Sequence, residues 1–177
     1  SDLSWNVSKV TNTSYMFHGA TDFNGNIISW DVSAVMDMTS MFQNASKFNQ
    51  DISGWKTSKV TFMDSMFYGA SQFNKHIGKW DIIKVTTMNS MFYGASSFNQ
   101  SLYNWGITFI NNPGFSPDKP NVNVTDMLNG TTSLQYYILT GDVSNDNIYH
   151  AVNLYKTNKP EYHYIYKPIY SWNTFSI

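Results

Sequence analysis

The chain has 177 residues, a net charge of −1 and only 13% charged residues. This balance lacks the basic surface of a nucleic-acid-binding protein and the polybasic face of a membrane-surface helix. Cysteine is absent, which excludes disulfides and cysteine-based metal or catalytic sites. Aromatic residues make up 17% of the sequence, which is more apolar mass than a disordered chain carries, so we expect a folded protein.

The first 105 residues repeat with a period of 25. Each of the first four repeats carries a tryptophan, a Met-Phe pair or its equivalent, an alanine and a Phe-Asn pair at matching positions. The tryptophans, which we expect to form one column in the core, are Trp5, Trp30, Trp55, Trp80 and Trp105. A period of this length is typical of a solenoid, in which each coil buries its apolar side chains against its neighbours.

The second repeat divides into two halves. Residues 28–33 alternate apolar and polar side chains, which predicts a short strand with Trp30 and Val32 turned inward. Residues 35–45 place apolar side chains mostly three apart, the stripe of a short helix, and we expect short, partly 3₁₀ helical turns here rather than a full helix. One strand and one helix per 25-residue coil predict an α/β fold, a leucine-rich-repeat-like solenoid.

One asparagine follows the second phenylalanine of each repeat. These residues are Asn24, Asn49, Asn74 and Asn99. An amide inside a turn needs partners for its donors and its acceptor, so we interpret the column as a ladder that bonds neighbouring coils or its own turn. A ligand-binding stripe is the alternative interpretation.

We expect the solenoid to cover residues 1–134 in about five repeats. The last repeat is degenerate and carries a loop at residues 108–121, where proline and glycine gather. Residues 135–177 form a Tyr-rich segment, and helical spacing within 144–156 predicts a C-terminal cap or a leader into a further array. The motif around Trp172 is similar to the start of another repeat, so we expect the sequence to come from a longer protein.

The third repeat carries a family resemblance. It reads Asp51-Ile52-Ser53-Gly54-Trp55, then Met66-Phe67-Tyr68-Gly69-Ala70, then Phe73-Asn74. This pattern resembles the 25-residue repeat of BspA-like surface proteins, also called the mycoplasma lipoprotein-associated repeat. The resemblance is close over residues 1 to about 110 and loose over 122–134. Three positions depart from it: Lys56 and Thr57 replace the usual Asp-Val, and Thr13 stands where other repeats have methionine.

No grouping of residues predicts catalysis or metal binding. The histidines His18, His76, His150 and His163 are scattered without metal-site spacing, and we expect no catalytic residue, metal or cofactor. The candidate binding residues lie beside the tryptophans, where the sequence varies between repeats and the predicted strand faces solvent. They are Asp31, Lys56, Lys79 and Asp81.

The resemblance implies an extracellular or cell-surface protein that acts in adhesion, host contact or surface assembly and has no catalytic residues. We therefore predict a non-catalytic repeat scaffold for adhesion or protein–protein recognition. The alternative is a structural component of a large DNA virus particle, at the virion surface, or of an extracellular filament. The expected partner is a protein or glycan on a host or neighbouring subunit, or a further array of the same chain. Nucleic acid and direct membrane insertion are not expected.

Overall fold

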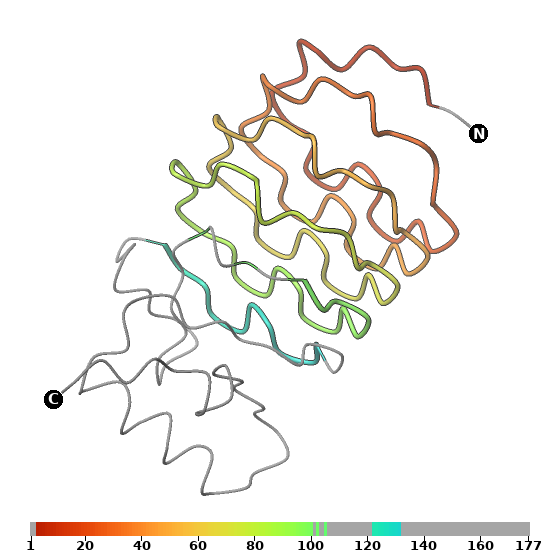
Figure 1. The fold of residues 1–177 in the computed structure, drawn as a ribbon, viewed down its shortest axis with the longest axis vertical. Coiled ribbons are helices and arrows are strands. Elements are labelled where there is room, and N and C mark those ends of the chain that lie inside the picture. The colour runs from red at the N-terminus through yellow and green to blue at the C-terminus, as the bar shows by residue number, and fades with distance from the viewer. Residues whose placement is uncertain (1–2, 101, 103–104, 106–121, 132–177) are drawn as a thin grey trace, which may run out of the picture.

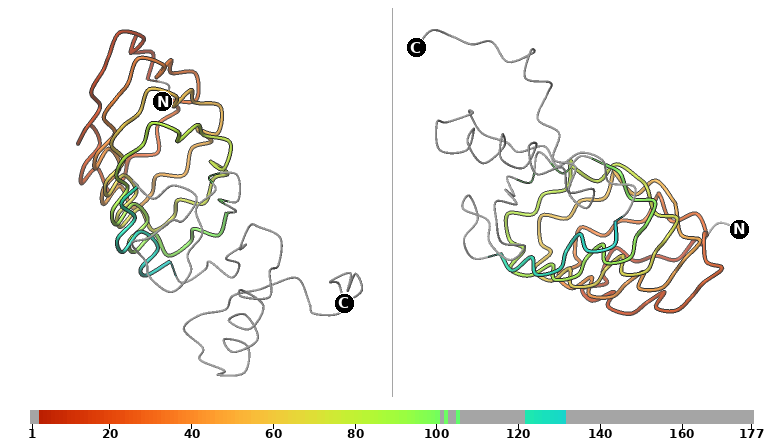
Figure 2. Two further views of the ribbon diagram at one scale, coloured as in Figure 1. Left: turned by 90° about the vertical axis from the view of Figure 1, so that its left-hand side faces the viewer. Right: turned by 90° about the horizontal axis from the view of Figure 1, so that it is seen from below.

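The computed structural model describes residues 3–100, 102, 105 and 122–131. Within them the chain winds through successive coils that lie side by side, beginning at the N-terminus (Figures 1 and 2). We number the coils 1 to 5 as residues 3–25, 26–50, 51–75, 76–100 and 122–131, and call equivalent positions in successive coils a column. The predicted loop at 108–121 and the segment 135–177 lie outside the described residues.

The described residues contain no α-helix and no strand longer than an isolated bridge. The bridges are parallel and join one column, pairing Asn12 with Asp37, Asp37 with Phe62, Phe62 with Thr87 and Thr87 with Asn123. The strand predicted at 28–33 and the helix predicted at 35–45 are therefore not present as such. Turns take their place, and the bridge column lies in the half of the coil that was expected to be helical.

The backbone hydrogen bonds of residues 38–45 explain why no helix forms. Alternate N–H groups donate to the next coil: Met38 to Phe62, Ser40 to Asp64, Phe42 to Met66 and Asn44 to Tyr68, at 2.7 to 3.0 Å. The intervening N–H groups close turns inside the coil: Met41 to Met38, Gln43 to Ser40 and Ala45 to Phe42. An α-helix would turn all of these groups onto its own carbonyls, whereas this turn segment shares them with its neighbour.

The spacing between coils leaves no room for helices. Equivalent phenylalanine rings of the first column of the core stack at 5.5 Å for Phe17–Phe42, 5.7 Å for Phe42–Phe67 and 5.6 Å for Phe67–Phe92. Packed helices lie roughly 8 to 10 Å apart, but paired strands only about 4.8 Å apart. Because the turns form hydrogen bonds to the next coil, the distance between coils in this half stays close to the spacing of paired strands.

Two columns of the turn segment have left-handed backbone. The first contains Tyr15, Ser40, Ser65, Ser90 and Asp126, with φ between 52° and 59°, and the second contains Gly19, Asn44, Gly69, Gly94 and Gly130, with φ between 59° and 76°. Left-handed residues occur singly and do not continue a helix. The second column uses glycine, and once asparagine, because these residues adopt this conformation at the lowest cost.

The core is a set of aromatic and aliphatic columns that run from coil to coil. Trp30, Trp55, Trp80 and Trp105 are buried, and the rings of Trp55 and Trp80 lie nearly parallel with centroids 6.3 Å apart. Trp5 stacks on Trp30 at 5.9 Å but is 56% exposed, because no described residue covers the other side of coil 1. Inside each coil a second ring closes the stack, as where Phe48 packs on Phe42 at 3.8 Å.

We predict that Gly69→Ala destabilises the protein by about 1 to 2 kcal/mol, the usual cost of a left-handed alanine. Its φ is +66°, and an added Cβ would also collide with Oδ1 of Asn44. The control is Gly54→Ala, which meets no atom within 4 Å and does not need positive φ. Chemical denaturation checks both; equal, small losses would show that the turn segment can relax around a side chain.

Trp55→Ala should lower the free energy of unfolding by at least ~3 kcal/mol, since it removes a buried ring from the middle of the stack. Trp5→Ala should cost clearly less because that ring is already more than half exposed. Urea unfolding of both variants measures the difference. Similar losses at the two positions would contradict a stability that depends on neighbouring coils.

Candidate binding surface

The four predicted binding residues are all exposed. Asp31, Lys56 and Asp81 occupy one column, and Lys79 lies two residues before Asp81. On either side of this column the side chains point inward, as Trp30 does. The predicted alternation of inward and outward side chains is thus present, but the four residues lie on turns and extended links that join no bridge, not on the face of a strand.

Short side-chain turns fix the shape of this surface. Oδ1 of Asp31 accepts a hydrogen bond from the N–H of Ser33 at 3.0 Å, and Oδ1 of Asp81 accepts one from Ile83 at 2.9 Å. Aspartate favours such turns because its short side chain can bond its own backbone two residues on. The Ser33 hydroxyl and N–H, with the charge of Lys56, hold the pKa of Asp31 below its ordinary value. The carboxylates of Asp31 and Asp81 therefore stabilise their turns and at the same time place negative charge on the surface.

Lysines gather along the same side of the coils. Lys9, Lys59 and Lys84 share one column, three residues beyond that of Lys56, and all are exposed. Within the described residues none of these lysines, nor Lys79, makes an ion pair. The ion pair that is present joins Asp22 and Lys47 at 2.7 Å, elsewhere on the coil. We call the exposed residues Asp31, Lys56, Asp81, Lys79, Lys9, Lys59 and Lys84 the turn face.

Two departures from the repeat pattern are accommodated by the next coil. Thr57 is buried in a column that holds valine or isoleucine in other coils, and its hydroxyl donates to the carbonyl of Asp81 at 2.9 Å. Thr13 is likewise buried, and its hydroxyl lies 3.2 Å from the carbonyl of Asp37. Buried hydroxyls need such partners, so both threonines keep the stack intact.

The asparagine column joins neighbouring coils. Each side-chain oxygen accepts a hydrogen bond from the backbone N–H of the next asparagine: Asn24 from Asn49 at 2.9 Å, Asn49 from Asn74 at 3.0 Å and Asn74 from Asn99 at 2.9 Å. Gln50 and Gln100 add a second donor to Asn24 and Asn74. The side-chain oxygens of Asn24, Asn49 and Asn74 thus bond the coil that follows each of them.

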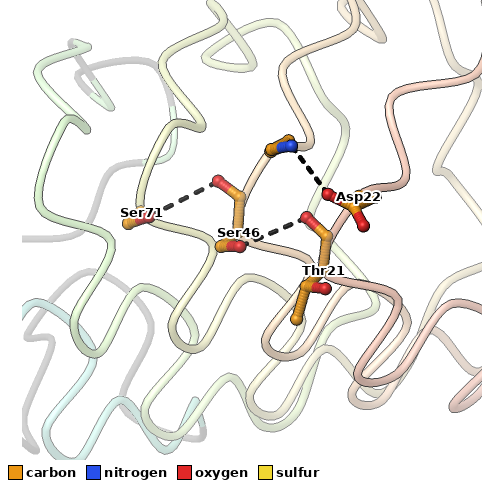
Figure 3. A network of polar contacts seen from close by, with 5 residues as sticks. Thr21, Asp22, Ser46 and Ser71 are labelled. Carbon is orange, nitrogen blue, oxygen red and sulfur yellow. Dashed lines mark hydrogen bonds and ion pairs between the residues drawn. The ribbon is translucent and has the colours of Figure 1, made fainter.

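Hydroxyl groups form a further ladder beside the asparagines (Figure 3). The hydroxyl of Ser46 donates to the carbonyl of Thr21 at 3.2 Å, and that of Ser71 donates to the carbonyl of Ser46 at 3.4 Å. Asp22, next to Thr21, makes the ion pair with Lys47. Serine or threonine recurs in this column at every 25th residue, and that recurrence is the signal in the sequence that could have revealed it.

The bridge column carries a second surface that the sequence did not indicate. Phe62 in this column and Met36, next to Asp37, have 44% and 49% of their surface exposed. Oδ1 of Asp64 accepts the N–H of Asn89 at 2.9 Å and the hydroxyl of Thr87 at 2.5 Å, so this surface is tied together by its own ladder. The residues of this column share no side-chain chemistry, and so no motif could reveal it.

No group of three or more His, Asp or Glu side chains that could hold a metal ion is found in the described part of the chain. His18 and His76 are exposed, whereas His150 and His163 lie outside the described residues. No helix that the structure describes is long and apolar enough to cross a membrane.

The model of a protein family described as "Mycoplasma protein of unknown function, DUF285" matches residues 2–105, which is more than half of the chain. The match covers coils 1 to 4 and ends at the last tryptophan of the column, Trp105. No curated protein and no solved structure matches the chain.

We predict that stability stays constant between neutral pH and about pH 5 and falls as the pH drops below about 4. The pKa values of Asp22, Asp31 and Asp51 are lowered in the folded protein, by Lys47, Ser33 and Ser53 in turn. The unfolded chain therefore binds protons first, and the stabilisation is lost as pH falls through the folded pKa values. Denaturation midpoints measured against pH check this.

The control is the double variant Asp31→Asn with Asp51→Asn. Asparagine keeps an oxygen that can accept the turn hydrogen bond but does not titrate. The acid loss of stability should become shallower in this variant. An unchanged acid slope would show that other carboxylates cause the loss.

Proposed function

The chain belongs to this family of mycoplasma proteins, and on that premise we propose that it is a non-catalytic scaffold for recognition displayed on a cell surface. Its partner is a protein or a glycan. The proposal is supported by the division of the coil into columns that pack and columns that face solvent, not by any reactive group. Extracellular display, adhesion and host contact belong to the same proposal.

One observation carries the proposal. The inward columns keep their residue type from coil to coil, while the exposed column after tryptophan changes, reading Asn6, Asp31, Lys56 and Asp81. The stacking of the core fixes where these side chains stand, and turn hydrogen bonds orient the side chains of Asp31 and Asp81. A surface whose frame is constant and whose side chains vary is suited to recognising a shape and a pattern of charge.

We assign the stack of coils to the leucine-rich-repeat-like solenoids, with the BspA-like surface arrays as its relatives. Five coils in parallel register and the bridges of one column support this assignment. Turns replace the helical half of the repeat, so the assignment rests on the period and on the stacking rather than on helix content. A solenoid of this kind would provide the extended framework on which the proposed recognition surface is carried.

The partner that fits the turn face carries negatively charged groups. Lys59 and Lys84 stand at the same place in adjacent coils, with Lys56 and Lys79 near them, and no described carboxylate neutralises them as an ion pair. Asp31 and Asp81 interrupt the positive charge, which favours a partner of matching pattern over a uniform polyanion. An acidic glycan or an acidic protein surface meets these requirements.

The test reverses the charges of the turn face. The triple variant Asp31→Lys, Lys56→Asp, Asp81→Lys should change binding to immobilised extracellular glycans and matrix proteins at least about tenfold, since like charges placed against each other across an interface cost several kcal/mol. The melting temperature should stay within a few degrees because all three side chains are exposed. Binding is measured on the full chain in low and in physiological salt.

The control exchanges Asp22 and Lys47, which reverses the two charges of an exposed ion pair outside the turn face and leaves the net charge unchanged. It should bind like the parent protein. If the turn-face variant and the control variant change binding equally, or if neither changes it, the turn face has no role in binding. Surface display is tested separately by protease treatment of intact cells, and a protein protected from protease would contradict it.

A further inference from the structure

Phe62 stands where the other described coils carry a polar residue. Its side chain is 44% exposed, and its column holds Asn12, Asp37, Thr87 and Asn123 in the other coils. In coils 1, 2 and 5 the side-chain oxygen at this position accepts the backbone N–H two residues on, at 2.7 to 3.2 Å. A phenylalanine cannot close that turn, since its side chain has no acceptor. Coil 3 therefore lacks this turn bond, and the ring is not buried either.

The exposure of Phe62 does not come from an end of the stack. Parallel bridges pair Phe62 with Asp37 in coil 2 and with Thr87 in coil 4, and residues paired in this way lie about 4.8 Å apart. The carbonyl of Met36 accepts the N–H of Phe62 at 3.3 Å, and the Met36 side chain is 49% exposed. Two apolar side chains thus face solvent on neighbouring coils in the middle of the described stack.

A network of polar side chains lies next to this ring. Oδ1 of Asp64 accepts the hydroxyl of Thr87 at 2.5 Å and the backbone N–H of Asn89 at 2.9 Å. The side-chain amide of Asn89 donates to the oxygen of Thr87 at 2.8 Å. Oδ2 of Asp64 and the second N–H of that amide bond no described residue. The network therefore offers one acceptor and one donor, and its own hydrogen bonds fix their positions.

These groups restrict the chemistry of a ligand. An aromatic ring packs against an apolar surface, and a carboxylate accepts hydrogen bonds without donating any, so the ligand must carry donors beside an apolar face. The carboxylates of Asp37 and Asp64 repel a phosphate, sulfate or carboxylate group. In the described coils, residues 11–14 and their equivalents include no lysine or histidine that would offset this repulsion. A neutral sugar ring meets these conditions, because it has a face of C–H groups and a rim of hydroxyls.

We propose that Phe62, Asp64 and Asn89 form a binding site for a neutral saccharide, which we call the sugar site. The C–H face of one sugar ring packs on Phe62. One hydroxyl donates to Oδ2 of Asp64 and another accepts from the side-chain amide of Asn89. Aromatic packing with a few fixed polar groups is the usual composition of small-ligand sites. The sugar site shares no residue with the turn face, so it goes beyond the proposed function.

Binding of the full chain to an array of neutral oligosaccharides tests the sugar site, and the best of them is then titrated by calorimetry. Phe62→Asn should lower its affinity at least about tenfold, as loss of a central aromatic contact does. The melting temperature should not fall, because asparagine is the residue at Asn12 and Asn123 and can restore the turn bond. Phe62→Trp keeps an aromatic face and should retain binding.

Asp64→Asn tests the polar half of the sugar site. The new amide keeps an oxygen for its bonds to Thr87 and Asn89 but replaces the free Oδ2 with a donor, so affinity should fall several-fold at an unchanged melting temperature. The control is Ile83→Ser, which removes another exposed apolar side chain and introduces the residue that coils 1 to 3 have in that column. It should bind the saccharide like the parent chain.

Three outcomes would overturn the proposal. They are the absence of binding to any neutral saccharide, equal affinities of the parent chain and Phe62→Asn, and binding of a lysine tetrapeptide in place of the saccharide that is lost in Asp64→Asn. The last outcome would assign the surface to cationic peptides. The triple variant of the turn face should leave saccharide affinity unchanged, so the sugar site and the turn face can fail independently.

Discussion

Hydrogen bonds from alternate residues of the turn segment hold each coil on the next, and the rest of the structure follows from the spacing that they set. Phe42 and Asn44 donate across the gap, while Gln43 between them closes a turn in its own coil. Every N–H of this stretch is therefore used without a helix. The coils can approach until equivalent phenylalanine rings lie between 5.5 and 5.7 Å apart, a separation too small for packed helices.

Side chains supply the bonds between coils where the backbone does not. The side-chain N–H groups of Trp30, Trp55 and Trp80 donate to carbonyls of the preceding coil, as where Trp80 bonds Ile52 at 3.0 Å. Asparagine oxygens meet backbone N–H groups at another corner, and serine hydroxyls meet carbonyls beside them. A narrow coil exposes many backbone groups relative to its apolar content, and leaving those groups unpaired in the stack would be costly. Columns of short polar side chains pair these backbone groups in successive coils.

The positions of the stacked columns could be predicted from the sequence, but the local conformation could not. A period of 25 places equivalent residues in contact, because stacked coils must bury the same kind of side chain in the same place. Apolar residues three apart, however, suit a helix and a series of turns equally well. The left-handed conformation of Ser40 and Ser65 has no signal in the sequence, since glycine is absent there. The bridge column was missed because its residues differ in type from coil to coil and the backbone makes the bridges.

The candidate binding residues illustrate the same limit. The alternation around Trp30 showed correctly which side chains point outward, because burial of the indole requires it. It did not show that Asp31 caps a turn instead of lying on a strand. The lysine column at Lys59 and Lys84 can be read from the sequence because the two residues are 25 apart. The turn geometry that exposes these lysines cannot be read from it.

The buried hydroxyl of Thr57 has a consequence for how such arrays can change. It depends on the carbonyl of Asp81, which belongs to the following coil. A repeat with threonine at this column cannot be moved to the last place of an array without stranding a polar group in apolar surroundings. Repeats of this chain are therefore not interchangeable units, and duplication or shuffling during evolution is restricted by which neighbour each repeat requires.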